Sequence, residues 1–291
     1  MNRHRCSVEV MGIEIRLLGE SDLPAALRLK VLAHWNQTEN DWRRLIKLEP
    51  NGCFCATDNG EVVATTTTTT YGRELAWIGM VLVDPAYRRR GIATRLMDVA
   101  LEYLTRKGLE TIKLDATPEG RLVYKNFGFR EESLVERWVG SSSRDMNCVL
   151  KESKGMRSQL LALDRHEFGA DRTTLLDQLI EDACLKPCLT TEDSGRLLGY
   201  GLARRGTVAT YLGPILAEQP AAAASLLDEM LNQLSEQRVY VDLNTTFDLG
   251  RQILKDRGFA KDRDLFRMFY GQEKQASSSP AIFAIAGPEV G

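Results

Sequence analysis

The amino-acid sequence predicts an α/β protein with two tandem domains, each a mixed, mostly antiparallel sheet with flanking helices. Strand-like and helix-like segments follow one another in the order β-α-α-β-β-β-α-β-α-β, which is typical of a mixed sheet with a crossover helix. The second half repeats this order: a hairpin glycine precedes a Gly-Phe pair by 68 residues from Gly60 to Gly128, and by 63 residues from Gly195 to Gly258. Such an internal repeat indicates two copies of one fold.

The first copy is expected over residues 11–150, and each of its elements has a local signal. Alternating apolar residues predict a strand over 13–17, and helical spacing and capping residues predict a helix from Ser21-Asp22 and another after Thr38, with Asp41 as its capping partner. A hairpin is expected at Asp58-Asn59-Gly60, between strands over 53–57 and 61–70, and is followed by a strand over 75–83. The remaining elements are a helix that starts at Gly91 and stops at Gly108, a strand around Ile112 and Leu114, and a short helix with Tyr124. The second hairpin strand holds six consecutive threonines, to which we assign no catalytic role.

The second copy is expected over residues 151–291, after a polar join at 151–158. Weaker signals in the same order predict a helix over 172–181, a hairpin at Asp193-Ser194-Gly195, strands over 197–202 and 209–216, an alanine-rich helix after Pro220, a strand over 239–243, a short helix at Ile253-Leu254 and a final strand over 281–286.

Composition and charge argue against several classes of protein. The 291 residues are 43% hydrophobic and 27% charged, as in a globular protein, and no apolar run approaches the roughly 18 residues that a membrane helix needs. The formal net charge is −2, so we expect no nucleic-acid partner. The start of the chain has no secretory signal, and the six cysteines favour free thiols over zinc or disulfides, so we expect a cytoplasmic protein without a metal.

The segment Arg88-Arg89-Arg90-Gly91-Ile92-Ala93-Thr94 is the clearest candidate for a binding site. Its three arginines precede a predicted helix, where the macrodipole is positive, which is unfavourable by about 0.3–1 kcal/mol per charge unless an anion is present. Gly91 replaces the usual Ser, Asp or Thr cap, so the first N–H groups stay free, and Ala93 leaves the first turn bare. Together these features predict a cradle for a pyrophosphate.

This segment resembles the Arg/Gln-x-x-Gly-x-Gly/Ala motif of the GNAT superfamily of N-acetyltransferases, with Arg88, Gly91 and Ala93 on the three defined positions. The preceding Val81-Leu82-Val83 resembles the family's splayed strand, whose backbone binds the pantetheine arm of the cofactor. Residues 114–129 resemble the family's second motif, in which Thr117 replaces the usual Asn.

The resemblance implies an enzyme that transfers an acetyl group from acetyl-CoA to a primary amine by direct attack on the thioester. It assigns acid catalysis to Tyr124, because a tyrosine at this position in the family lies near the cofactor sulfur and protonates the leaving thiolate. It also implies that residues 81–83 and 88–94, Thr117 and Tyr124 bind the cofactor, and that the N–H of Val81 or Leu82 holds the oxyanion.

The general base and the acceptor contacts are less closely defined. Candidates for the base come from strand ends and an early loop, with ordered water as the alternative: Glu74, Asp115 and His34. In the family the early helices wall the acceptor pocket, which suggests four acceptor contacts: Trp35, Asn36, Gln37 and Trp77. The tryptophans among them are equally good candidates for the core.

The second copy lacks the motifs of the first. Where the pyrophosphate loop would lie, residues 217–223 read Ala-Glu-Gln-Pro-Ala-Ala-Ala, and Leu254 stands where the first copy has Tyr124. We expect this copy to bind no cofactor and to complete the acceptor pocket or pack as an internal pseudo-dimer, in a monomer or a homodimer. The leading hypothesis for the acceptor is a small-molecule amine. The alternatives are acetylation of a protein lysine or N-terminus, and a non-catalytic acyl-CoA-binding regulatory module.

Overall fold

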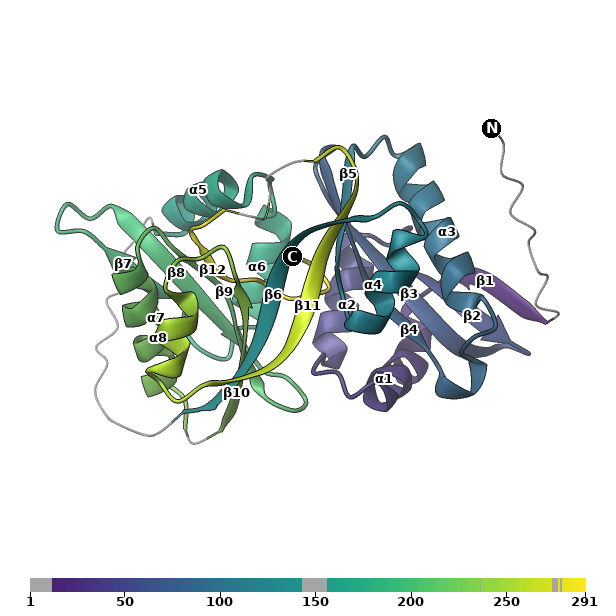
Figure 1. Ribbon diagram of the computed structural model, residues 1–291, viewed down its shortest axis with the longest axis horizontal. Helices are drawn as coiled ribbons and strands as arrows, with labels where there is room; N and C mark the ends of the chain where they lie inside the picture. The colour runs from purple at the N-terminus through teal and green to yellow at the C-terminus, as the bar shows by residue number, and fades with distance from the viewer. Residues whose placement is uncertain (1–11, 143–155, 236, 274–276, 278) are drawn as a thin grey trace.

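The structure, a computed structural model, describes residues 12–142, 156–235, 237–273, 277 and 279–291 (Figure 1). The first half contains, in chain order, β1 (Ile13–Leu17), the 3-10 helix η1 (Glu20–Asp22), α1 (Leu23–Leu32), α2 (Glu39–Leu48), β2 (Phe54–Asp58), β3 (Glu61–Tyr71), β4 (Leu75–Val83), the 3-10 helix η2 (Pro85–Tyr87), α3 (Ile92–Arg106), β5 (Thr111–Ala116), α4 (Pro118–Lys125) and β6 (Arg130–Ser141). The second half contains α5 (Met156–Phe168), α6 (Thr173–Glu181), β7 (Cys188–Thr191), β8 (Leu197–Arg204), β9 (Thr210–Ala217), α7 (Pro220–Asn232), β10 (Arg238–Asn244), α8 (Gly250–Lys255), β11 (Ala260–Gly271) and β12 (Ile282–Ala284). The boundary expected between residues 150 and 151 lies outside the described residues.

Local chemistry sets the ends of several elements where the sequence predicts them. The N–H of Thr38 donates to the Asp41 carboxylate at 2.7 Å, and the N–H of Asp41 donates to the Thr38 hydroxyl at 3.4 Å, which closes a capping box at the start of α2. Asn59 and Gly60 both have positive φ, 49° and 88°, as the tight turn between β2 and β3 requires. One prediction needs correction: α5 begins at Met156, inside the stretch that we expected to be a polar join.

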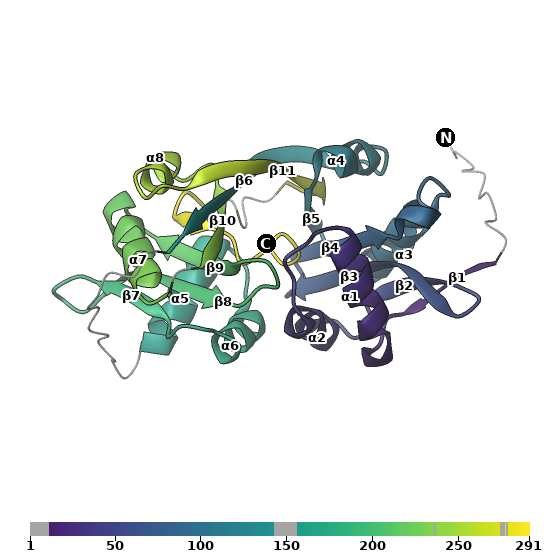
Figure 2. The ribbon, with the colours of Figure 1, turned by 90° about the horizontal axis from the view of Figure 1, so that it is seen from below.

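The strands of the described residues form one continuous sheet, in which the two halves exchange strands. The strand order is β1-β2-β3-β4-β5-β11-β6-β10-β12-β9-β8-β7. Strand β11 of the second half lies between β5 and β6, and β6 of the first half lies between β11 and β10. Figure 2 shows β6 and β11 side by side across the junction of the halves. Each half therefore completes its part of the sheet with a strand from the other half.

Helices cover both faces of this sheet. In the first half, α1 and α2 pack on the face that carries Cys53 and Trp77, while α3 packs on the face that carries Phe54 and Ala64. The core beneath α1 and α2 continues beneath α5 and α6, so one apolar layer spans both halves. The threonines of β3 lie between the two layers, with at most 1% of each residue exposed from Thr65 to Thr69.

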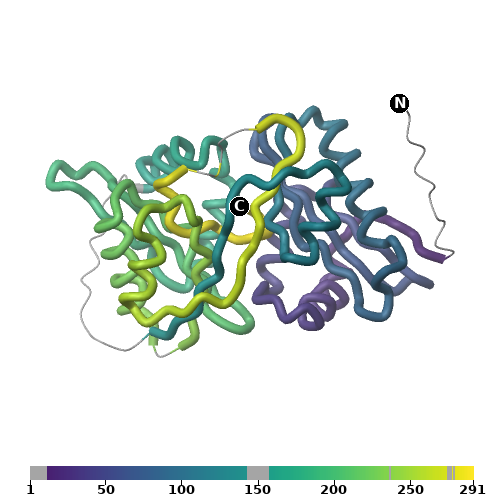
Figure 3. The backbone as a smooth tube through the Cα atoms, viewed as in Figure 1, coloured from purple at the N-terminus to yellow at the C-terminus, as the bar shows by residue number. Residues whose placement is uncertain are grey.

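The sheet opens at one place in each half. Strand β4 pairs with β5 only through Leu75–Trp77, and beyond this point the two strands separate. In the second half, β9 and β10 pair through Thr210–Leu212 and then separate in the same way. There β12 lies between them and pairs with both. Among the described residues, only the opening in the first half is therefore free of a strand, and the chain continues from β12 to end between the halves (Figure 3).

Candidate active site

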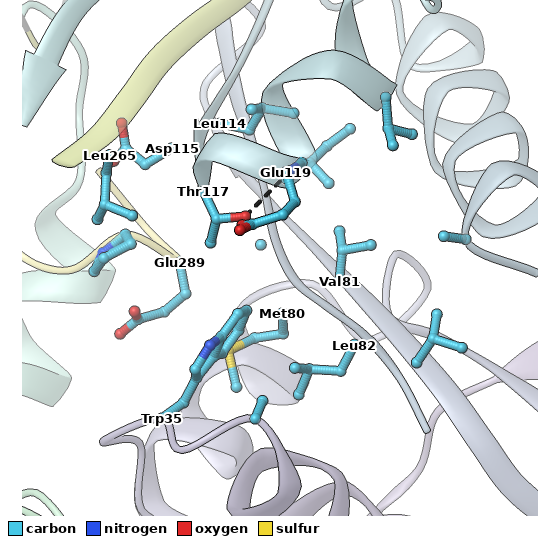
Figure 4. A pocket seen from close by; sticks show the side chains of 18 of the residues that line it. Trp35, Met80, Val81, Leu82, Leu114, Asp115, Thr117, Glu119, Leu265 and Glu289 are labelled. Carbon is cyan, nitrogen blue, oxygen red and sulfur yellow. Dashed lines mark hydrogen bonds between the residues drawn. The ribbon is translucent and has the colours of Figure 1, made fainter. Parts of the chain in front are cut away.

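A cavity of about 1020 Å³ lies at the opening between β4 and β5 and has walls from both halves of the chain. Val81 and Leu82 of β4 form one side, and Leu265 of β11 and Glu289 form the opposite side (Figure 4). Thr117 lies between these sides, across the cavity from Trp35. The cavity is therefore bounded by the predicted cofactor strand on one side and by the second half on the other.

The first turn of α3 borders this cavity and has the features expected of an anion site. Gly91 is the N-cap, with φ of 77°, and no side chain caps the helix. A Cβ added at Gly91 would meet nothing within 4 Å, so the space beside it is open. The side chains of Arg88, Arg89 and Arg90 are exposed around it. Free N–H groups, a positive helix end and three cations favour a bound phosphate group.

The structure brings most of the predicted cofactor residues together. Those that line the cavity are Val81, Leu82, Val83, Arg88, Arg89, Ala93, Thr117 and Tyr124. The others belong to the adjoining first turn of α3: Arg90, Gly91, Ile92 and Thr94. The Ile92 side chain is 1% exposed and packs in the core, so only its backbone can face a ligand.

Strand β4 offers free backbone to the cavity. Beyond Trp77 no strand of the described residues pairs with its β5-facing edge, so backbone groups of Val81 and Leu82 on that edge are available to a ligand. The Val83 carbonyl accepts a hydrogen bond from Nε of Arg88 at 3.3 Å. The strand is also irregular here, because Met80 has φ of 50° and the pairing with β3 shifts between Thr65 and Thr67. A bulge of this kind changes the direction in which the neighbouring backbone groups point, and bulges are common beside binding sites.

Tyr124 of α4 lines the cavity, and its ring also packs against that of Phe129. Gly120 makes room for the ring one turn earlier, since a Cβ at Gly120 would lie 3.1 Å from Cε2 of Tyr124. No described residue forms a hydrogen bond with the Tyr124 hydroxyl, and burial raises the pKa of the phenol above its ordinary value. The phenol is therefore protonated near neutral pH and is free to donate to a ligand.

Thr117 has one of its two hydrogen-bonding functions already in use. It is the N-cap of α4, and its hydroxyl oxygen accepts from the Gly120 N–H at 3.1 Å (Figure 4). The hydroxyl proton remains available, so Thr117 can still donate a hydrogen bond where the usual Asn of the family would lie.

The three predicted base candidates occupy very different places. Asp115 lines the cavity but forms a two-armed ion pair with Arg267, with both distances 2.9 Å. Burial raises the pKa of Asp115, and Arg267 opposes that rise. His34 is an exposed residue on the cavity wall, whereas Glu74 lies in the turn before β4 and does not line the cavity.

Glu289 is a cavity carboxylate that the sequence did not point to. It is 4% exposed and accepts hydrogen bonds from Gln37 at 2.9 Å and from Arg204 at 3.0 Å. Burial raises the pKa of Glu289, while the Arg204 guanidinium opposes that rise. It follows the final strand and reaches the cavity only through the fold, so no local signal could have found it.

The structure places two of the four predicted acceptor residues at the cavity and two away from it. Trp35 and Gln37 line the cavity, but Asn36 and Trp77 do not, and we no longer assign them acceptor contacts. Asn36 instead holds the second half, because its side-chain amide donates to the Ala209 carbonyl at 3.0 Å and accepts from two N–H groups there. Trp77 is fully buried, and its indole N–H donates to the Pro288 carbonyl at 2.9 Å.

Within the described residues, no group of three His, Cys, Asp or Glu side chains is placed to hold a metal ion. No helix there is both long enough and apolar enough to cross a membrane.

A mixed sheet that opens beside an uncapped, arginine-flanked helix is the arrangement that the resemblance to the GNAT superfamily implies, and comparison with known proteins agrees. Residues 22–129 match the family model described as "Acetyltransferase (GNAT) family", and residues 160–284 match "Acetyltransferase (GNAT) domain". The chain belongs to the GNAT acetyltransferases and carries two of their domains in tandem. Members of this family use acetyl-CoA and act on amine acceptors.

Two relatives match this chain over most of their own length. The chain is 27% identical over 286 residues to the uncharacterized N-acetyltransferase YitH of Bacillus subtilis (strain 168), covering 96% of this chain and 98% of YitH. It is 28% identical over 262 residues to holothin acyltransferase of Pseudoalteromonas sp. (strain SANK 73390), covering 88% and 87%. Its fold matches that of a Pyrococcus horikoshii protein assigned as an acetyltransferase, with a TM-score of 0.80 and 22% identity across the whole of both chains. The protein is an acyltransferase, and the alternative of a non-catalytic module is not retained.

Proposed function

We propose that this enzyme transfers the acetyl group of acetyl-CoA to a primary amine of a small molecule. The observation that carries the proposal is the second wall of the cavity, where β6, β11 and Glu289 cover the side opposite the cofactor strand. A lysine on a folded protein needs an open groove, so this wall favours a small acceptor. The similarity to a relative named for acyl transfer to holothin is a second support.

The proposed reaction assigns each step to a group at the cavity. The neutral amine attacks the thioester carbon, and the N–H of Val81 or Leu82 stabilises the oxyanion. The C–S bond then breaks, and the leaving thiolate takes the proton of Tyr124. The proton released by the amine passes to Glu289 or, through ordered water, to solvent, and the Tyr124 phenolate takes a proton back from solvent before the next turnover. The first turn of α3 and its arginines hold the pyrophosphate of acetyl-CoA.

The second domain, in this proposal, binds no cofactor. Its sheet opening contains β12, where a pantetheine arm would have to lie. At the start of α7, Glu218 is held by Arg196 at 2.7 Å, and a carboxylate in that place repels phosphates. Leu254 takes the position of the catalytic tyrosine and is fully buried.

Calorimetric titration of acetyl-CoA into the wild-type chain and two glycine variants tests the proposal. Gly91→Glu places a carboxylate in the cradle and should abolish binding. Gly108→Glu is the matched control, because Gly108 has nearly the same φ (76° against 77°) and equally open surroundings, but lies at the other end of α3. We expect one site per chain in the wild type and in Gly108→Glu, and none in Gly91→Glu.

Other results would change specific parts of the proposal. Two sites per chain would mean that the second domain also binds acetyl-CoA. Equal loss of binding in both variants would assign the effect to backbone strain rather than to the cradle. Acetylation of folded proteins but of no free amine would refute the small-molecule acceptor.

A further inference from the structure

Two arginines face each other across the strand exchange, on the acceptor side of the cavity. Arg137 of β6 and Arg263 of β11 are directly paired in the antiparallel register, and both line the cavity. Like charges directly opposite each other on neighbouring strands destabilise a sheet. The fold therefore carries an unfavourable pair at the cavity wall.

The two guanidinium groups differ in how they are neutralised. Arg137 is buried and donates to both oxygens of Asp242, at 2.7 and 2.6 Å, so it has a complete counter-ion. Arg263 forms no hydrogen bond with any described residue, and the nearest carboxylate, that of the exposed Asp262, is 3.3 Å away and poorly aligned. Burial, and then the nearby Arg137, lower the pKa of Arg263.

The buried carboxylates of the cavity are already paired with other cations. Asp115 is held by Arg267, and Glu289 is held by Arg204 and Gln37. The remaining carboxylate on the wall, Glu119, is exposed beside Thr117 at the base of α4. The pyrophosphate cradle at the start of α3 has arginines of its own. Within the described residues the Arg263 guanidinium has only the exposed Asp262 as an ion-pair partner, so it can still meet a negative group that enters the cavity from outside.

We propose that Arg263, supported by Arg137, binds an oxyanion of the acceptor, so that the substrate is an amine that also carries a carboxylate or a phosphate. This inference rests on the proposed function, because it concerns the acceptor of the same site. A planar guanidinium can donate two parallel hydrogen bonds to either oxyanion, and such charge-assisted bonds are strong in a partly dry cavity.

Matched pairs of amines that differ only in the anion test this inference. The carboxylate arm compares 4-aminobutanoate with 4-aminobutanamide, and the phosphate arm compares 2-aminoethyl phosphate with 2-aminoethanol. In the wild type we expect kcat/KM to be about ten-fold or more higher for the anionic member of one pair, and the arm that shows the preference identifies the oxyanion. Arg263→Gln should remove the preference, and the exposed Arg106→Gln on α3 should keep it.

Two further measurements separate failure of this inference from failure of the proposed function. Binding of the same pairs is measured by calorimetry with coenzyme A present, so that a preference can be detected without turnover. A preference in binding that Arg263→Gln removes supports the anion site even if no amine is acetylated. Acetylation or binding that does not depend on the anion, or a preference that Arg263→Gln leaves intact, overturns the proposed anion site.

Thermal unfolding provides the folding control for Arg263→Gln, because removing the like-charge contact should leave the melting temperature equal to or above that of the wild type.

Discussion

At the scale of single residues, Tyr124 combines a free hydroxyl with a position on the cavity wall. The absence of a Cβ at Gly120 leaves room for the ring, and the raised pKa of the phenol keeps its proton in place through the neutral range. A weak acid of this kind retains its proton in the ground state and gives it up only to a strongly basic group. The thiolate of coenzyme A becomes such a group when the C–S bond breaks in a partly dry site.

Tyr124→Phe should therefore lower kcat by about 10²-fold or more, because the thiolate would leave without a proton donor. The affinity for acetyl-CoA should stay near the wild-type value, since the ring remains. Release of coenzyme A, followed with a thiol reagent, measures the rate. Tyr270→Phe is the control, because Tyr270 lies exposed on β11 and does not line the cavity. An unchanged kcat in Tyr124→Phe would remove this residue from the proposed mechanism.

Glu289 gives a prediction about pH dependence. A base must be ionised, and burial raises the pKa of this carboxyl, so the active fraction grows only as pH rises past the ordinary range of glutamate. We expect kcat/KM to rise with pH through an inflection above that range, apart from the ionisation of the amine itself at higher pH. Glu289→Gln should lose this pH-dependent rise, whereas Glu61→Gln at the start of β3, outside the cavity, should retain it. If kcat/KM of Glu289→Gln still rises with pH in this range, water rather than Glu289 accepts the proton of the amine.

At the scale of elements, the sequence predicted what short segments determine. The capping box of Thr38 and Asp41, the Asn59-Gly60 turn and the uncapped start of α3 each depend on a few neighbouring residues, and the structure has all of them. The proposed pyrophosphate segment and Tyr124 could be put forward from the sequence for the same reason, because each motif lies within one loop and one helix, and their roles stay predictions.

The sequence could not predict which distant segments meet. Strands β6 and β11 have no local feature that favours partners in the other half, and β12 is only three residues long. The same limit applies to Trp77, because a strand residue faces the core or a cavity according to its neighbours in the sheet. It also applies to Glu289 and Arg263, whose surroundings are built from both halves.

At the scale of the whole molecule, the two domains share one sheet and one cavity. Buried contacts link the two domains at several places. Arg267 of β11 pairs with Asp115 of β5, and the Asn36 side chain accepts hydrogen bonds from the N–H groups of residues 208 and 209. The Pro288 carbonyl, after β12, accepts a hydrogen bond from the Trp77 indole. The second domain thus supplies one wall of the site and also the partner strand of β5. Loss of catalytic motifs from that domain is compatible with these two tasks, since neither requires a cofactor.

This arrangement predicts that the first domain does not fold alone. A fragment that ends near residue 150 leaves β5 without β11 along Thr111–Ala116, and leaves the side chain of Asp115, fully buried in the whole chain, without Arg267. Breaking a buried ion pair by removing one partner costs about 3–5 kcal/mol, a large part of the 5–15 kcal/mol that stabilises a typical domain. An exposed sheet edge adds a tendency to aggregate.

Expression of residues 1–150 alone, of 151–291 alone, and of both fragments together tests this prediction. We expect each fragment alone to be aggregated or to lack a cooperative thermal transition. The two fragments produced together should associate through β6 and β11 and recover one acetyl-CoA site per pair in calorimetry. A monomeric 1–150 fragment that unfolds cooperatively and binds acetyl-CoA would show that the exchanged strand is dispensable. The second domain would then contribute to the acceptor wall alone.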